Sequence, residues 1–187
     1  MGMPAQNPVA EPMTAEELER LDIPGKVTEL IRGRLVVREP PGTNHGRIAA
    51  RLLFLVGEYV YRHRLGVIFA QDTGFKIESK PDTVRAPDVA FLAQDRADQL
   101  PRRGYAALAP DLLAEIVSPD DSRGEVLAKV GSWLAAGVRL VWVIYPERPE
   151  AQIFRADGTV SIVGADGPLE GESVLPGFSV PLADVLR

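Results

Sequence analysis

The chain has 187 residues, which suffices for one compact domain of ordinary size and is short for two. Its apolar fraction of 45% and charged fraction of 25% are those of a globular protein with a full hydrophobic core. The net charge of −5 argues at first against a nucleic-acid partner, and the absence of cysteine excludes disulfides, thiolate zinc sites and cysteine nucleophiles.

The two ends of the chain differ from its middle. Residues 1–12 (MGMPAQNPVAEP) are rich in proline and small side chains, which predicts a disordered lead-in to a single domain at 13–187. They lack the basic and apolar segments of a signal peptide, and no apolar stretch approaches the roughly 20 residues of a membrane helix. We therefore expect a cytoplasmic protein that does not enter a membrane. Residues 31–144 carry 16 basic and 13 acidic residues, a net of +3, so the negative charge lies at the ends.

A short helix, a hairpin and a long helix are predicted in the first third of the chain. Thr14 and Glu17 fit a capping box, which opens a helix of about two turns. Residues 29–37 form two β-prone runs around a tight turn, as in a β-hairpin. Across residues 45–64 the apolar side chains recur at steps of three and four, which predicts a long helix ended by Gly66.

Strands dominate the next part. Three β-rich runs are predicted as strands at 67–71, 74–78 and 86–92. A polar loop is expected at 93–110. The short apolar run Leu112–Val117 that follows is interrupted by a single acid, Glu115.

The last third is predicted to contain a helix, a central strand and a second hairpin. Ser122 and Glu125 form another capping box, opening a helix that ends near Ala136. The run at 140–145 is apolar on both faces, as expected of a central strand, and a hairpin with strands at 151–155 and 159–163, then a helical turn from Pro181, complete the chain. This order predicts an α/β domain with a mixed sheet flanked by helices and added β-hairpins.

Two carboxylates stand out because of where they lie. Asp88 begins a strand-like run after Pro87, and Glu115 sits among apolar neighbours whichever face of its strand it occupies. Burying an unpaired carboxylate costs several kcal/mol, so a cation, hydrogen bonds, protonation or a metal has to offset that cost. The alternatives are that Asp88 caps a turn and that Glu115 faces water on an edge strand.

Lys129 is a candidate partner for these acids. On the predicted helix it falls about 100° from the centre of the apolar stripe, at the boundary between core and solvent. Its aliphatic stem can cover apolar surface while its ammonium reaches a nearby site, although a solvated boundary lysine fits the same phase. Two carboxylates and a lysine together would suit a hard cation, Mg²⁺ or Mn²⁺, that acts on a phosphodiester.

Several motifs occur in a specific order along the chain. They are RAPDV at 85–89, PDLLAEIVSP at 110–119, Lys129, AGV at 136–138 and VWVIYP at 141–146. This ordered set resembles the Uma-type endonuclease family, long known as a domain of unknown function, within the PD-(D/E)XK nuclease superfamily. The resemblance extends from Met13 through the first hairpin and His45 to the tail segment LPGF at 175–178, and it implies a restriction-endonuclease-like fold.

The resemblance implies roles for individual residues. Asp88 and Glu115 match the acidic metal ligands, with the carbonyl of Ile116 as a further ligand. The superfamily pattern has a lysine two residues after the glutamate, where this chain has Val117, and Lys129 on the next helix is expected to take its role.

Two further positions match the family with less defined roles. Glu29 could join the metal shell or be structural, and His45 could contact phosphate or make helix-start hydrogen bonds. His63 has no match and is expected to be exposed. The family often has an acid and an aromatic residue before the tryptophan, where this chain has Leu140 and Val141.

The leading hypothesis is therefore a Mg²⁺- or Mn²⁺-dependent phosphodiesterase with DNA as substrate, most simply an endonuclease. The alternative is a non-catalytic binding or scaffold protein on the same fold, and a third option is another phosphate-bearing substrate such as RNA or a nucleotide. A homodimer would place two sites on two DNA strands. Four arginines are candidates for phosphate contacts, with surface solubility as the competing role: Arg47, Arg51, Arg102 and Arg103.

Overall fold

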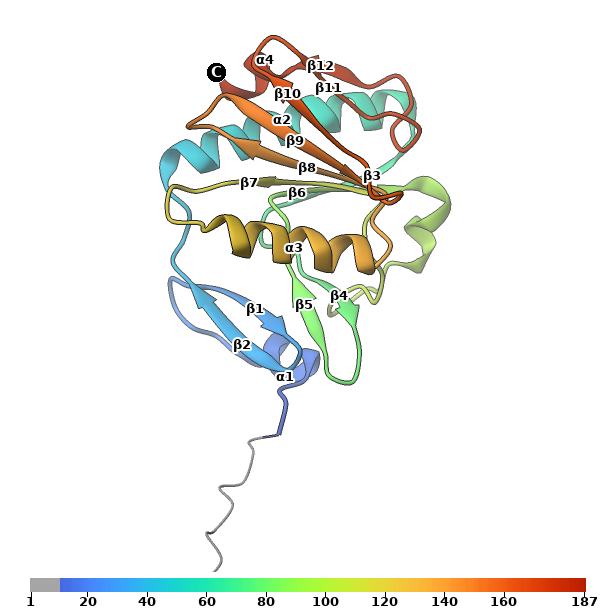
Figure 1. The fold of residues 1–187 in the computed structure, drawn as a ribbon. Helices are drawn as coiled ribbons and strands as arrows, with labels where there is room; N and C mark the ends of the chain where they lie inside the picture. The colour runs from blue at the N-terminus through green and yellow to red at the C-terminus, as the bar shows by residue number, and fades with distance from the viewer. Residues whose placement is uncertain (1–10) are drawn as a thin grey trace, which may run out of the picture.

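The computed structural model describes residues 11–187, which form a large sheet between helical layers and a smaller sheet beside it (Figure 1). All but two residues of the lead-in predicted at 1–12 lie outside the described residues. Within the described part, no helix is both long enough and apolar enough to cross a membrane.

The larger sheet has six strands in the order β10-β9-β8-β7-β6-β3. Their bounds are β3 Gly66–Ala70, β6 Val89–Ala93, β7 Leu112–Ile116, β8 Leu140–Tyr145, β9 Glu150–Arg155 and β10 Val160–Gly164. β7 and β8 run parallel, and the other neighbours run antiparallel. A parallel pair needs a crossover connection, which α3 (Arg123–Ala135) supplies. The mixed sheet that the sequence predicts is therefore confirmed.

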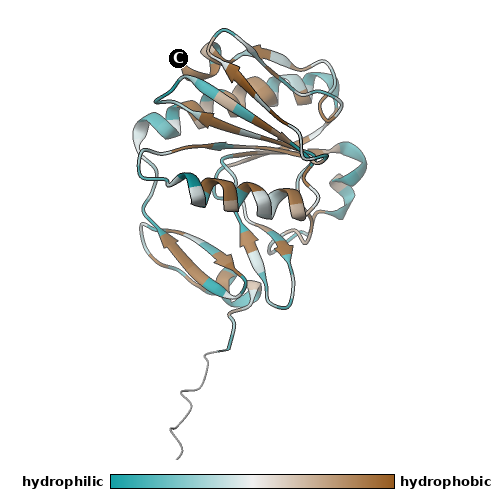
Figure 2. Ribbon diagram, in the orientation of Figure 1, coloured by the Kyte–Doolittle hydropathy of each residue, from teal (hydrophilic) through white to brown (hydrophobic). Residues whose placement is uncertain are grey.

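Helices cover both faces of this sheet. The long helix α2 (Thr43–His63) and the terminal helix α4 (Leu182–Leu186) pack on one face, and α3 packs on the other. Alternate side chains of β8 enter the two cores, with Leu140, Trp142 and Ile144 toward α2 and Val141, Val143 and Tyr145 toward α3. Figure 2 shows β8 mostly in brown, the colour of hydrophobic residues. A strand that is apolar on both faces is what a central position requires.

The smaller sheet has the strand order β2-β1-β5-β4 and carries a third core. Its strands are β1 Val27–Ile31, β2 Arg34–Arg38, β4 Phe75–Glu78 and β5 Thr83–Arg85. Leu18 of α1 (Ala15–Arg20) packs there with Leu30 and Val84. The chain passes from β5 to β6 of the larger sheet through residues 86–88, so Asp88 lies where the two sheets meet (Figure 1).

Local signals account for several element boundaries. Both predicted capping boxes are present, with Thr14 opening α1 and Ser122 opening α3. The predicted hairpin β1–β2 turns at Arg32 and Gly33, which have φ of 49° and 75°, as a tight turn with two left-handed residues requires.

Other boundaries differ from the prediction. α2 ends where Arg64 adopts a left-handed conformation (φ 54°), so the predicted stop at Gly66 was wrong, and Gly66 instead opens β3. The strand predicted at 86–92 is β6, which starts at Val89, and the preceding β5 was not predicted. The loop predicted at 93–110 contains the 3-10 helix η1 (Gln94–Gln99). The small pair β11 (Pro168–Glu170) and β12 (Ser179–Pro181) was also missed.

One edge of the large sheet is apolar. The edge strand β10 has the sequence VSIVG, without a charged residue. Its side chains Val160 and Ile162 are 53% and 66% exposed. They are paired with Phe154 and Gln152 of β9. Their side chains lie on the face of the sheet that carries α3, outside the area that α3 covers.

Candidate active site

Sheet register brings the two acids together. β6 and β7 are antiparallel neighbours, and Val89 is paired with Ala114. Continuing this register by one residue sets Asp88 opposite Glu115. The Asp88 side chain adds a contact to β7 at this end of the strand pair, because its Oδ2 accepts a hydrogen bond of 2.7 Å from the amide of Ile116. Neither of the structural alternatives applies, since Asp88 caps no turn and Glu115 is buried in a strand with neighbours on both sides.

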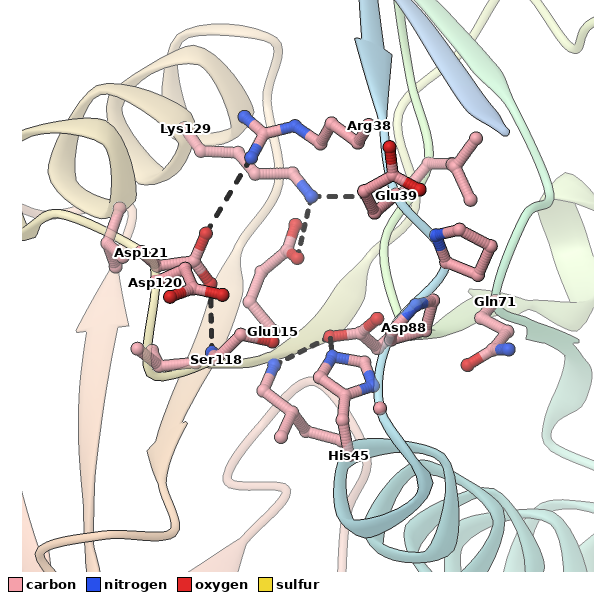
Figure 3. Close-up of a pocket in the computed structure, with 18 of the residues that line it drawn as sticks. Arg38, Glu39, His45, Gln71, Asp88, Glu115, Ser118, Asp120, Asp121 and Lys129 are labelled. Carbon is pink, nitrogen blue, oxygen red and sulfur yellow. Dashed lines mark hydrogen bonds and ion pairs between the residues drawn. The ribbon is translucent and has the colours of Figure 1, made fainter. Parts of the chain in front are cut away.

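Lys129 reaches these acids from α3. Its Nζ lies 2.8 Å from Glu115 Oε2 and 3.2 Å from the carbonyl oxygen of Ala86, and it lies 3.6 Å from Glu29 Oε1. The side chain of Lys129 is only 22% exposed, so it is a partner of the acids and not a solvated boundary lysine. The structure thus brings Asp88, Glu115 and Lys129 from three separate stretches into one place (Figure 3).

A fourth residue holds Glu115 and was not recognised in the sequence. The indole nitrogen of Trp133, one turn after Lys129 on α3, donates a 2.8 Å hydrogen bond to Glu115 Oε1. Trp133 is fully buried. The position of Trp133 on the apolar stripe of its helix indicated only that it lies in the core. The stripe of one helix does not show which polar atom of the neighbouring sheet its indole nitrogen contacts.

Glu29 occupies a buried position next to Lys129. Its Oε1 accepts a hydrogen bond of 3.0 Å from the amide of Ala86, and its Oε2 lies 3.4 Å from Nη1 of Arg85. Arg85 is itself buried and was not singled out in the sequence. Among the described residues Glu29 is the only carboxylate that pairs with this buried guanidinium, which favours a structural role over a place in a metal shell.

His45 approaches Asp88 from the first turn of α2. Its Nε2 lies 3.2 Å from Asp88 Oδ2, and the side chain is 11% exposed. Among the described residues, the other ring nitrogen is buried without a hydrogen-bond partner. His45 therefore contacts a candidate metal ligand and does not serve as a helix cap.

The charged groups of the cluster shift one another's pKa. Burial raises the pKa of Glu115 to about 7, against the opposing effect of Lys129. The pKa of Lys129 is raised, because the charges of Glu115, Glu29 and Asp88 outweigh the effect of its burial. The pKa of His45 is also raised, since the hydrogen bond and charge of Asp88 outweigh desolvation. The ammonium of Lys129 is thus fixed as a cation.

A cavity of about 540 Å³ opens over these groups. It is walled by the end of β2, the start of α2 and the loop from β7 to α3, where Arg38 lies 3.6 Å from Asp121 (Figure 3). Two fixed cations line it, Arg38 and Lys129. They face eight carboxylates: Glu29, Glu39, Asp72, Asp88, Glu115, Asp120, Asp121 and Glu125. The cavity is therefore suited to attract a cation.

The donor set fits a hard divalent ion. Asp88, Glu115 and the main chain of Ile116 offer oxygen atoms, which Mg²⁺ and Mn²⁺ prefer. Within residues 11–187, no group of three or more His, Asp or Glu side chains is arranged to hold an ion. Two carboxylates still suffice for Mg²⁺, because it keeps several of its waters and binds proteins through one or two carboxylates.

Other candidates from the sequence lie outside the cavity lining. Arg47 and Arg51 of α2 donate hydrogen bonds to the main-chain carbonyls of Leu186 and Asp184 in α4. Arg102 and Arg103 are exposed in the loop before β7, and His63 is exposed near the C-terminal end of α2, as expected. Arg47 and Arg51 thus have a structural role in this fold.

Comparison with known proteins identifies a family and solved structures of similar fold. A family model described as "Uma2: Putative restriction endonuclease" matches residues 15–183. A crystal structure from Anabaena variabilis ATCC 29413, described as "a putative nuclease belonging to DUF820", superposes with a TM-score of 0.79. It is 21% identical in sequence, and the match covers 94% of this chain and 98% of that one, which confirms the predicted nuclease-like fold. No curated protein matches the chain.

Proposed function

The chain belongs to the family described as "Uma2: Putative restriction endonuclease", and from that membership we propose that it is a metal-dependent endonuclease that hydrolyses phosphodiester bonds in DNA. The observation that carries the proposal is the convergence of Asp88, Glu115 and Lys129 in one cavity. Carboxylates that bind a cation and an ammonium that binds a phosphate are the groups that phosphodiester hydrolysis needs.

Asp88, Glu115 and the Ile116 carbonyl would hold Mg²⁺ or Mn²⁺. Such an ion supplies a Lewis acid, which polarises the phosphate and lowers the pKa of a bound water. In the reaction a bond would form between the water oxygen and phosphorus, and the bond from phosphorus to the leaving oxygen would break. The proton lost by the water would pass to solvent, and the leaving oxygen would take a proton from solvent.

Lys129 acts as an electrostatic group in this proposal. An ammonium whose pKa is raised cannot take the proton from the attacking water, so it does not serve as the base. It has three donors, of which two are used at hydrogen-bond distance by Glu115 and Ala86. The third is available to stabilise charge that develops on the phosphate oxygens.

The acidic lining makes the ion necessary for substrate binding as well. A polyanion entering a cavity with eight carboxylates and two fixed cations meets net repulsion unless a cation is bound first. The same lining is what favours the second candidate, a binding protein that takes a cationic partner. The two candidates differ in whether DNA is cut.

We propose further that the protein acts in the cytoplasm as a homodimer. A chain without cysteines fits a reducing compartment. Two copies related by a two-fold axis would present two cavities to the two strands of a duplex.

Cleavage of supercoiled plasmid, linear DNA and RNA with Mg²⁺ or Mn²⁺ tests the proposal. Asp88→Asn, Glu115→Gln and Lys129→Met should each reduce cleavage by at least about 100-fold, the range seen when one electrostatic group is removed from an active site. Asp98→Asn is the charge-matched control, because Asp98 is exposed on η1 outside the cavity lining. Cleavage that survives in all three cavity variants, or no cleavage of any substrate by the wild type, would contradict the proposal.

A further inference from the structure

The orientation of the Glu115 carboxylate is fixed by two donors on one helix. Lys129 donates to Oε2 and Trp133 donates to Oε1, each at 2.8 Å. The two residues are four positions apart on α3, so they lie one turn apart on the same side of the helix. Each carboxylate oxygen therefore has one donor, and each keeps a second lone pair for another ligand.

One donor alone would leave the carboxylate free to rotate. A glutamate side chain has three rotatable bonds, and a single hydrogen bond to the flexible stem of a lysine removes little of that freedom. Trp133 is rigid by comparison, because its ring is fully buried in the core between α3 and the large sheet. Adding its N–H defines the plane of the carboxylate.

The indole N–H also adds no charge. Lys129 already places one cation beside Glu115, and a second one would repel a divalent ion at this distance. A neutral donor holds the carboxylate without that repulsion. This combination of one charged and one neutral donor suits a metal ligand better than a structural ion pair.

We infer that Trp133 is a positioning residue, whose indole N–H holds Glu115 in the orientation that binds a divalent cation. The inference rests on the proposed function, since it assigns Trp133 to the same site. Trp133 touches neither the substrate nor the ion and acts through Glu115.

The chain contains a matched control. It has two tryptophans, and the second, Trp142 of β8, is also fully buried. Trp142 lies in the other core, with its ring stacked on Phe178 at a centroid distance of 5.8 Å. Its indole nitrogen has no hydrogen-bond partner among residues 11–187. Trp133→Phe and Trp142→Phe therefore make the same change in two cores, and only the first removes a bond to Glu115.

The first measurement is nuclear magnetic resonance of the two indole N–H groups in the full-length protein labelled with ¹⁵N. Each tryptophan variant removes one signal and so assigns both. On addition of Mg²⁺ the Trp133 signal should shift and the Trp142 signal should stay in place, and Glu115→Gln should abolish the shift. This measurement does not need a DNA substrate.

The second measurement is the affinity for Mg²⁺ and Mn²⁺ by calorimetry. Trp133→Phe should weaken it by about 10-fold or more, as for other residues that orient a metal ligand, and Trp142→Phe should leave it within about 2-fold. Urea denaturation shows whether each variant is folded at the assay temperature.

The outcomes separate the two proposals. If the wild type binds Mg²⁺ and Trp133→Phe, shown to be folded, binds it equally well, Trp133 does not position Glu115 and the metal site stands. A Trp133 signal that does not move while Mg²⁺ binds would overturn the inference in the same way. If the wild type binds neither ion, the proposed function and the inference fail together.

Discussion

Glu29 and Arg85 form an ion pair in the interior, with 3.4 Å between Oε2 and Nη1 and with side chains only 4% and 5% exposed. The pair joins β1 to β5, and Glu29 also accepts the amide of Ala86 two residues before Asp88. A buried pair of this kind holds the chain in place at the junction of the two sheets. It connects the hairpin β1–β2 to the candidate site.

Glu29→Gln should therefore destabilise the protein far more than it weakens metal binding. The change leaves Arg85 as a buried charge with Ser132 as its other side-chain partner, at 3.4 Å, and breaking such a pair costs about 3 kcal/mol. Urea denaturation measures this loss, and calorimetry should show a much smaller loss of Mg²⁺ affinity than Glu115→Gln causes, because Glu29 contributes only one of the eight carboxylates of the cavity. Glu39→Gln, on an exposed acid paired with Lys26, should cost less than about 1 kcal/mol. A large loss of Mg²⁺ affinity in folded Glu29→Gln would place Glu29 in the metal shell.

Lys129→Met should destabilise the protein in a pH-dependent way. At about pH 8 the change leaves Glu115 without its cation, so the buried carboxylate has to stay charged and unpaired or take up a proton, at a cost of up to about 3 kcal/mol. At about pH 5 the cost should shrink, because a carboxyl whose pKa is raised to about 7 is already protonated in the folded state. The free energy of unfolding at the two pH values measures the difference. An equal loss at both would mean that the packing of the lysine stem matters and its charge does not.

Mg²⁺ affinity should fall as the pH falls below neutrality. A proton has to leave Glu115 before its carboxylate can bind the ion, and burial raises the pKa of Glu115 to about 7. The apparent Kd should therefore rise by up to about tenfold per pH unit below that value and level off above it. His45→Gln separates the contribution of His45, whose pKa is also raised, because it removes the imidazole and keeps a donor for Asp88. An affinity independent of pH would contradict the burial of an ionisable ligand.

Ser122→Ala should destabilise α3, the helix that carries both donors to Glu115. The Ser122 side chain accepts the amide of Glu125, and loss of such a cap costs about 1 kcal/mol. Thr14→Ala removes the equivalent cap of α1 and should cost a similar amount. Urea denaturation compares the two. A negligible effect of Ser122→Ala alone would show that core packing holds the start of α3 without its cap.

Local periodicity identified candidate residues, and the family resemblance grouped them into one site. Helical phase set Lys129 at the edge of the apolar stripe, and that position is what lets its ammonium reach Glu115. The single acid within the apolar run at 112–117 predicted a buried carboxylate in a strand, as β7 shows. These features depend on residues near one another in sequence.

Features that depend on contacts between distant segments could not be predicted in the same way. Whether the N–H of Trp133 meets Glu115 depends on how α3 is rotated against the sheet. The burial of Arg85 depends on Glu29, 56 residues earlier in the chain. Arg47 and Arg51 are of a residue type that often contacts phosphate, yet both donate hydrogen bonds to main-chain carbonyls of the last helix, which packs beside them.

The uncharged edge strand β10 bears on how the protein behaves in concentrated solution. An edge with unpaired main-chain groups and exposed Val160 and Ile162 is a template for pairing with another strand, and natural proteins guard such edges with a lysine. Purified protein should therefore form aggregates at high concentration through this strand. Ile162→Lys should raise its solubility and leave the cavity unchanged, which makes it the preferable background for crystallisation and spectroscopy.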